Sequence, residues 1–426
     1  MAFSLFDSKG TDIDQQQFTW RDLVQKPISK LDDDGQCRWF AQRGGRLKFG
    51  VSTSPTPRCA SRQRAWRHSR VRVQTRRRSR DALQCGMTQI TLVLPFALPP
   101  PELAADLIRA MQAPALAALL ARAACTSLPY DDNLRALPHE TWLAKELGLS
   151  PEGQSAFACA AMRGMLLDPG QGSWFIVNPA HIDIARSHLS ISDIRQLHID
   201  EGHARALFDT ARPLFDEIGK TLLYGDASTW FMRADGWETL QTASPDAAVG
   251  LNLTDWLPTG ASAVDFRKLQ NEVQMLWFDH PANIERESRG LAVINSFWPW
   301  GWSGPGVTMP PKPIFATSGV PSWLAAMATS PSVALPNPFT QGGEDSMLVC
   351  GDLSAPAIAA DWADWLVHMA RFEKTLFAPA LVALKQGHAG QLKLVVSNRH
   401  SHKEFITSKW AQHAFWRSPS LDRLLP

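Results

Sequence analysis

The side chains best suited to chemistry lie within one short segment, residues 280–301. It offers an imidazole, two amides and a guanidinium, on His280, Asn283, Asn295 and Arg286. A guanidinium stays protonated at every physiological pH, so Arg286 can supply charge to an anion. We therefore predict a ligand site in this segment.

The same segment ends in residues rich in tryptophan and glycine. Gly301 lets the backbone approach a ligand because it has no side chain, while Trp298 and Trp300 can wall a pocket. An aromatic corner packed without any ligand explains these residues equally well, and the sequence leaves both interpretations open. The complete predicted ligand-binding set is His280, Asn283, Arg286, Asn295, Trp298, Trp300 and Gly301.

A helix and a strand must position these residues. Apolar residues recur at helical spacing over 262–278, and this helix ends at the Asp279-His280-Pro281 turn. Asn283 can cap the next turn. A strand over 292–298 then leads into the tryptophan–glycine loop.

From residue 87 onward the remaining sequence alternates between strand and helix patterns. Short apolar runs predict strands at 90–95, 173–178, 228–233, 313–317, 346–350, 391–397 and 404–410. Other segments predict helices at 102–112, 115–124, 139–147, 152–166, 199–218, 320–328 and 356–386. The alternation predicts an α/β fold with a central, mostly parallel sheet flanked by helices, and an inserted or appended subdomain.

One short block turns an acidic chain into one of net charge +2. Residues 35–86 hold 14 basic residues and one acidic residue, whereas residues 87–426 hold 25 basic and 33 acidic ones. Ten arginines lie between positions 58 and 80, where they could bind nucleic-acid phosphates. The block has no helical or strand period, so we expect a non-native or disordered leader at 1–86 and the functional domain at 87–426.

Several protein classes are excluded by composition and motifs. No run reaches the 18 or so apolar residues of a membrane span, and the N-terminus lacks the apolar core of a secretory signal. Six cysteines form no Cys-x-x-Cys pair, so we expect reduced thiols in a cytoplasmic protein. The phosphate-binding loop, the dinucleotide fingerprint, the nucleophile elbow and the His-Glu-x-x-His zinc motif are all missing.

Taken together, motifs in residues 87–426 resemble known families. From His280 onward, His-Pro-x-Asn-x-x-Arg, then Gly290, then Asn-x-x-Trp-x-Trp-Gly resembles the archaeal-type cofactor-independent phosphoglycerate mutases of the alkaline phosphatase superfamily. A closer resemblance is to a bacterial family, the RpfE-type regulatory proteins. It is carried by the segments TLVLP at 91–95, NPAHI at 178–182, NEVQM at 271–275 and FAPALVALKQGHAGQLKLVV at 377–396. The resemblance implies an alkaline-phosphatase-like fold.

For active members of the mutase family, the resemblance implies a centre of two divalent metals (Mn²⁺ or Zn²⁺). Asp and His side chains hold these metals beside a Ser or Thr nucleophile. This chain departs from that pattern twice. Its first strand ends in Leu94-Pro95-Phe96 instead of an Asp-Gly motif, and residues 396–400 read VSNRH where the mutases carry Ala-Asp-His. We therefore predict a phosphoglycerate-mutase-like regulatory protein with no metal, no other cofactor and no catalytic residue.

Two alternatives stay open. An active metal-dependent mutase or phosphatase could draw its metal ligands from Asp345, Asp352, His400 and His402. A nucleic-acid-binding regulator would act through the arginine-rich leader. For the regulatory protein itself we expect a small phosphorylated ligand or a protein partner, and neither nucleic acid nor a membrane.

Overall fold

The computed structural model describes residues 88–129, 135–150, 154–184, 189–305, 314, 316–329, 345–414 and 416–426, together with 5–6 and 12–13. The chain divides into two compact units after Arg77. In the first unit, β1 (Leu5–Phe6) pairs antiparallel with β2 (Asp12–Ile13). The arginine-rich block and the predicted domain boundary at 86/87 lie outside the described residues. The second unit carries all that follows.

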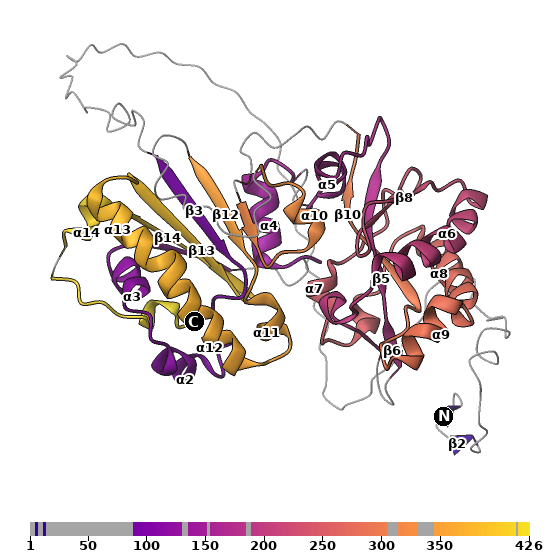
Figure 1. Ribbon diagram of the computed structural model, residues 1–426, viewed down its shortest axis with the longest axis horizontal. Helices are drawn as coiled ribbons and strands as arrows, with labels where there is room; N and C mark the ends of the chain where they lie inside the picture. The colour runs from indigo at the N-terminus through magenta and orange to yellow at the C-terminus, as the bar shows by residue number, and fades with distance from the viewer. Residues whose placement is uncertain are drawn as a thin grey trace, which may run out of the picture. The chain divides into compact units, whose positions relative to one another are not determined.

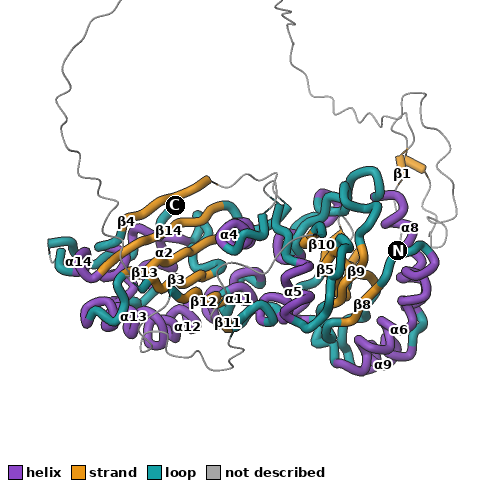
Figure 2. The backbone as a smooth tube through the Cα atoms, turned by 90° about the horizontal axis from the view of Figure 1, so that it is seen from above, coloured by secondary structure: helices purple, strands orange, loops and turns teal. Residues whose placement is uncertain are grey.

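A six-stranded sheet forms the centre of the second unit. Its strand order is β11-β12-β3-β13-β14-β4 (Figure 2). The first four strands run parallel to one another, and β14 pairs antiparallel with both β13 and β4. The predicted α/β class with a mostly parallel sheet is thereby confirmed. The strands span Gln89–Leu94 (β3), Ala124–Pro129 (β4), Ala316–Ser318 (β11), Ser346–Cys350 (β12), Gln391–Ser397 (β13) and Ser401–Ser408 (β14).

The central strands are continuous apolar runs because both faces of the sheet are covered. Along β3, Leu92 and Leu94 pack into one apolar cluster and Val93 into another, as the two-residue period of a strand requires. The first cluster is shared with α2 (Ala104–Ala110), α3 (Pro114–Ala121), α12 (Trp362–Phe372) and α13 (Ala378–Gln386), and Figure 1 shows α12 and α13 lying across the sheet. The second is shared with α4 (Pro138–Glu146).

A second sheet, of four antiparallel strands in the order β10-β5-β9-β8, is built from residues 174–303. This segment lies between β4 and β11 in the chain, so the subdomain is an insertion. One face of the sheet packs on α6 and α8, and the other joins the apolar cluster of α4. The elements span Trp174–Ala180 (β5), Glu201–Glu217 (α6), Leu222–Tyr224 (β8), Trp230–Arg233 (β9), Ala263–Phe278 (α8) and Ser296–Ser303 (β10).

Short elements complete the second unit. They are α5 (Ala158–Gly164), β6 (Ile182–Ile184), β7 (Leu189–Ile191), η3 (Ile194–Gln196), α7 (Pro245–Ala248), η4 (Leu253–Asp255), α9 (Pro281–Ser288), α10 (Ser322–Ala325), α11 (Ser354–Ile358), α14 (Lys409–Gln412) and η6 (Asp422–Leu424). Among the described helices, no single one has the length and apolarity to cross a membrane. Only α2 and α3 taken as a pair, bent by 120°, meet that test.

The strands β4, β6, β7 and β8 were not predicted, and two predicted elements were wrong. The helix predicted at 356–386 is broken into α11, α12 (Trp362–Phe372), the π-helical turn η5 (Glu373–Phe377) and α13 (Ala378–Gln386). The first break follows from Ala360, whose φ of +56° is left-handed, and from Asp361, whose side chain caps α12 by accepting from the N–H of Asp364. The loop predicted after residue 298 is instead strand, because β10 continues to Ser303.

Candidate functional site

Asn283 and Arg286 of the predicted ligand-binding set lie within α9, and His280 immediately precedes it. Arg286 is fully buried, and its guanidinium donates to the main-chain carbonyls of Ala292 (2.9 Å), His198 (3.4 Å) and Leu197. His280 is the N-cap of α9, where Nδ1 accepts from the N–H of the second residue of the helix at 3.1 Å. Both side chains therefore hold the insertion's backbone, and their ligand-binding role stays a prediction.

The two predicted asparagines also bind main chain. The Asn283 amide donates to the carbonyls of Trp277 and Ile294 and accepts from the Ile294 N–H, each at 2.8 Å. Asn295 accepts from the N–H of Ile182 at 2.8 Å and donates to its carbonyl at 2.9 Å. These bonds fix the path of the chain between α8 and β10.

The tryptophan–glycine motif is the part of the predicted set that reaches a cavity. Trp298 is fully buried and donates to the carbonyl of Ala243 at 2.7 Å. Trp300 donates to Oδ1 of Asn178 at 2.6 Å and lines two neighbouring cavities, and Gly301 lines the second of them. The structure thus separates Trp300 and Gly301 from the other five residues.

The first cavity, of about 160 Å³, lies where the six-stranded sheet meets the insertion. Val93 and Pro95, at the end of β3, and Val349 and Gly351, at the end of β12, form its floor. The carboxyl ends of parallel strands are the usual ligand-binding edge of an open α/β sheet. Its other lining residues include His139, Glu140, Leu143, Asn178, Ile194, Arg195, Ser228, Thr229, Asp246, Trp300, Val320, Trp323, Leu324 and Ser354.

An ion pair dominates the polar side of this cavity. Arg195 of η3 donates two parallel hydrogen bonds to Asp246 of α7, from Nη1 to Oδ2 at 3.0 Å and from Nη2 to Oδ1 at 2.8 Å. Its Nε also donates to Oδ2 of Asp193, the N-cap of η3, at 3.1 Å. Two carboxylates therefore neutralise the one guanidinium that lines the cavity.

Glu140 is a buried carboxyl group in the lining of this cavity. It is buried near the start of α4, and its Oε2 accepts from the N–H of Leu137 at 2.6 Å and from Oγ of Ser244 at 2.7 Å. Burial raises its pKa to about 7, against the opposing effect of these hydrogen bonds. Glu140 can therefore hold or release a proton near neutral pH, which is typical of groups at functional sites.

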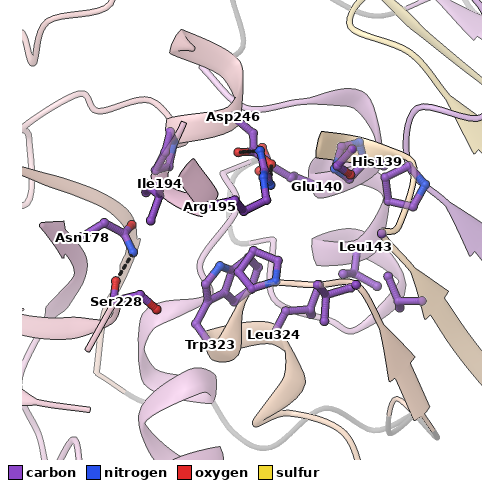
Figure 3. A pocket seen from close by; sticks show the side chains of 18 of the residues that line it. His139, Glu140, Leu143, Asn178, Ile194, Arg195, Ser228, Asp246, Trp323 and Leu324 are labelled. Atoms are coloured by element: carbon purple, nitrogen blue, oxygen red, sulfur yellow. Dashed lines mark hydrogen bonds and ion pairs between the residues drawn. The ribbon is translucent and has the colours of Figure 1, made fainter. Parts of the chain in front are cut away.

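The neighbouring His139 is shifted in the opposite direction. Burial lowers its pKa to about 4, so the imidazole is neutral at pH 7. Its Nδ1 lies 3.2 Å from Oγ of Ser397 at the end of β13. Figure 3 shows Arg195, Asp246 and Glu140 gathered on one side of the cavity.

Aromatic and aliphatic side chains form the opposite wall. Trp323 stacks edge-to-face on Trp300 with ring centroids 5.0 Å apart, and it also contacts Phe157 at 4.9 Å. Within the insertion, Asn178 of β5 donates to the carbonyl of Ser228, before β9, at 2.7 Å (Figure 3). Apolar walls with a few fixed polar groups are typical of a small-molecule site.

The metal ligands considered from the sequence do not converge. Asp345 precedes β12, where its Oδ1 accepts from the N–H of Gln89 at 2.8 Å, and Asp352 follows the other end of the strand. A five-residue strand holds its two ends roughly 16 Å apart. His402 lies within β14, and His400 lies in the turn before it.

The cavity itself does not supply a metal site either. Within the described ranges no three His, Cys, Asp or Glu side chains lie close enough to share an ion. The carboxylates of Asp246 and Glu140 already accept from Arg195 and Ser244. The residues present therefore do not fit the two-metal centre that the sequence resemblance implies for active mutases.

No protein-family model matches the chain, and no curated protein matches its sequence. The chain is similar in structure to the cofactor-independent phosphoglycerate mutase from Thermoplasma acidophilum, at 15% identity and a TM-score of 0.36, over 79% of this chain and 94% of the other. It is also similar to the PH0037 protein from Pyrococcus horikoshii, at 11% identity and a TM-score of 0.44, over 76% and 88%. The resemblance to RpfE-type proteins stays a prediction.

Proposed function

We propose that this chain is a phosphoglycerate-mutase-like regulatory protein that binds a small molecule in the first cavity and does not transfer phosphoryl groups. The observation that supports this most is the bidentate pair of Arg195 and Asp246. Phosphoryl transfer requires cations that neutralise charge on several phosphate oxygens. Here the cavity's guanidinium is already neutralised, and its partner carboxylate is unavailable to a metal.

The lining indicates the kind of ligand. Trp300 and Trp323 offer flat apolar surface, while Asp246 and Glu140 offer acceptor oxygens. A compact molecule with one apolar face and with hydroxyl or amine donors would match both the tryptophan wall and the carboxyl groups of this cavity. A phosphate group has no free cation among these lining residues, so the predicted phosphorylated ligand would direct its phosphate elsewhere.

Filling the cavity tests the binding role. Ile194 is partly exposed and lines the cavity, whereas Gln196, in the same turn, is exposed and does not line it. We expect native mass spectrometry of the full chain, isolated gently without added phosphorylated compounds, to show a bound small molecule that carries hydroxyl or amine groups and no phosphate. Ile194→Trp should lose it and Gln196→Trp should keep it.

Two results would contradict the proposal. One is the absence of any bound molecule in the wild type. The other is Mn²⁺-dependent conversion of 3-phosphoglycerate to 2-phosphoglycerate by the wild type but not by Ile194→Trp, which would make the cavity an active site.

A further inference from the structure

A second cavity, of about 340 Å³, lies beyond Trp300 and is chemically unlike the first. Trp300 lines both cavities. Ser244 lines the second, while its hydroxyl donates to Glu140 in the first. The remaining lining residues are Arg135, Ala136, Thr141, Gln154, Ser155, Leu240, Gln241, Thr242, Thr259, Gly301 and Trp302.

The charge of this second cavity is not neutralised by its lining. Among the lining residues that the structure describes, Arg135 is the one that carries a charge, and none is Asp or Glu. The guanidinium donates through Nη2 to the carbonyls of Leu257 (2.8 Å) and Asp255 (3.5 Å), which are neutral groups. Burial lowers the pKa of Arg135, the direction expected for a desolvated charge without a counter-ion. Arg195 in the first cavity, by contrast, binds two carboxylates.

Two further donors in the lining residues are unused. Nε of Arg135 and Nε1 of Trp302 are buried and have no hydrogen-bond partner among the described residues. A buried donor left unpaired costs about 1–3 kcal/mol. A ligand that accepts hydrogen bonds would recover this free energy, so the donors favour an acceptor such as a phosphate or carboxylate.

The backbone of β10 shapes this wall. Pairing with β5 shifts register between Trp300 and Ser303, and Gly301 within the shift has a φ of +65°. Such a bulge redirects side chains, and glycine adopts this left-handed conformation without strain. The tryptophan–glycine motif thus lets Trp300 and Trp302 line one cavity.

We propose that the second cavity binds a small hydroxyl-bearing anion whose phosphate or carboxylate is held by Arg135. The hydroxyl side chains of Thr141, Ser155 and Thr242 line the same space and suit the ligand's hydroxyl groups. Trp302 supplies a flat surface and an N–H donor. This site is separate from the first cavity and does not depend on the function proposed for it.

Isothermal titration calorimetry of the full chain with three related probes tests the site. Glycerol 3-phosphate presents a phosphate, glycerate presents a carboxylate, and glycerol presents hydroxyl groups alone. We expect at least one of the anions to bind and glycerol not to bind. The anion that binds with the higher affinity identifies which acid group Arg135 recognises.

Matched variants locate the binding. Arg135→Gln should weaken the anion at least tenfold, and Trp302→Phe, which removes the N–H but keeps a ring, should weaken it about threefold. Arg212→Gln on the exposed surface of α6 should leave the affinity unchanged. Ile194→Trp, which fills the first cavity only, should also leave it unchanged.

The proposal fails if neither anion binds the wild type, or if Arg135→Gln folds normally and binds as tightly as the wild type. It also fails if Ile194→Trp abolishes binding while Arg135→Gln preserves it, because the anion would then occupy the first cavity. If Arg135→Gln does not fold, an unchanged affinity in Trp302→Phe overturns the proposal. Mn²⁺-dependent mutase activity would contradict the proposed function alone and leave this site standing.

Discussion

Three arginines of this chain show how surroundings decide what a guanidinium does. Arg286 is surrounded by main-chain carbonyls and fixes the backbone. Arg195 is bound by two carboxylates and shapes the first cavity. Arg135 faces neutral carbonyls and the second cavity, which leaves its charge for a ligand. Residue type alone predicts none of these roles, because each depends on partners distant in sequence.

Replacing Arg286 should affect stability strongly. Arg286→Ala leaves the carbonyls of Ala292 and Leu197 unpaired and opens a cavity in the insertion, so we expect the free energy of unfolding to fall by about 3 kcal/mol or more. Chemical denaturation measures this. Arg289→Ala, at an exposed position of the same segment, is the control and should change stability by less than about 0.5 kcal/mol. Equal midpoints for the two variants would contradict the structural role.

Glu140 should make stability depend on pH. Its pKa is about 7 in the folded chain and near 4.5 when unfolded, so between these values the folded state holds more protons. Stability is then greatest below about 4.5 and falls as the pH rises to about 7. Glu140→Gln has no proton to lose, so its unfolding free energy relative to wild type should rise by about 2–3 kcal/mol from pH 5 to 7.5. If the free energy of unfolding changes with pH in the same way in the wild type and in Glu140→Gln, this role of Glu140 is ruled out.

At the scale of elements, a buried glutamate joins the broken C-terminal helix to α3. Glu373 of η5 accepts from the N–H groups of Ala115 (2.6 Å) and Leu116 (3.2 Å), in the first turn of α3. Pro114 occupies the first helical position, where no N–H is needed. The π-helical turn thereby places a carboxylate on the positive end of a helix packed under the sheet.

Removing this carboxylate should loosen α3. Glu373→Ala leaves two N–H groups unsatisfied, so we expect a loss of about 1–2 kcal/mol in the free energy of unfolding, measured by urea denaturation. Glu373→Gln keeps an acceptor and should lose less. If Glu373→Ala is as stable as the wild type, the cap does not contribute.

Local sequence patterns predicted the helices and strands better than they predicted the residues that line the first cavity. The strands of the sheet core, such as Gln391–Ser397 and Ser346–Cys350, are apolar runs whose pattern is set by burial on both faces. The break at Ala360 has no glycine or proline to signal it. The pair of Arg195 and Asp246 escaped prediction because 51 positions separate the two residues and only the fold unites them. Trp300 and Gly301 were accessible to prediction because their motif is contiguous.

At the scale of the whole second unit, the insertion and the six-stranded sheet together form the first cavity. The six-stranded sheet brings the ends of β3 and β12 to one edge, and the insertion contributes η3, α7 and β10 against that edge. Neither part forms the first cavity alone. The inserted segment also supplies both members of the ion pair in this cavity, Arg195 and Asp246.

The central claim is a mutase-like scaffold that binds a small molecule without a two-metal centre. Metal stoichiometry tests it most directly: the full chain is incubated with Mn²⁺ and Zn²⁺, freed of excess ions and measured by inductively coupled plasma mass spectrometry. The arrangement of Arg195, Asp246 and Glu140 predicts no tightly held ion. About two ions per chain would contradict the account and restore the active mutase.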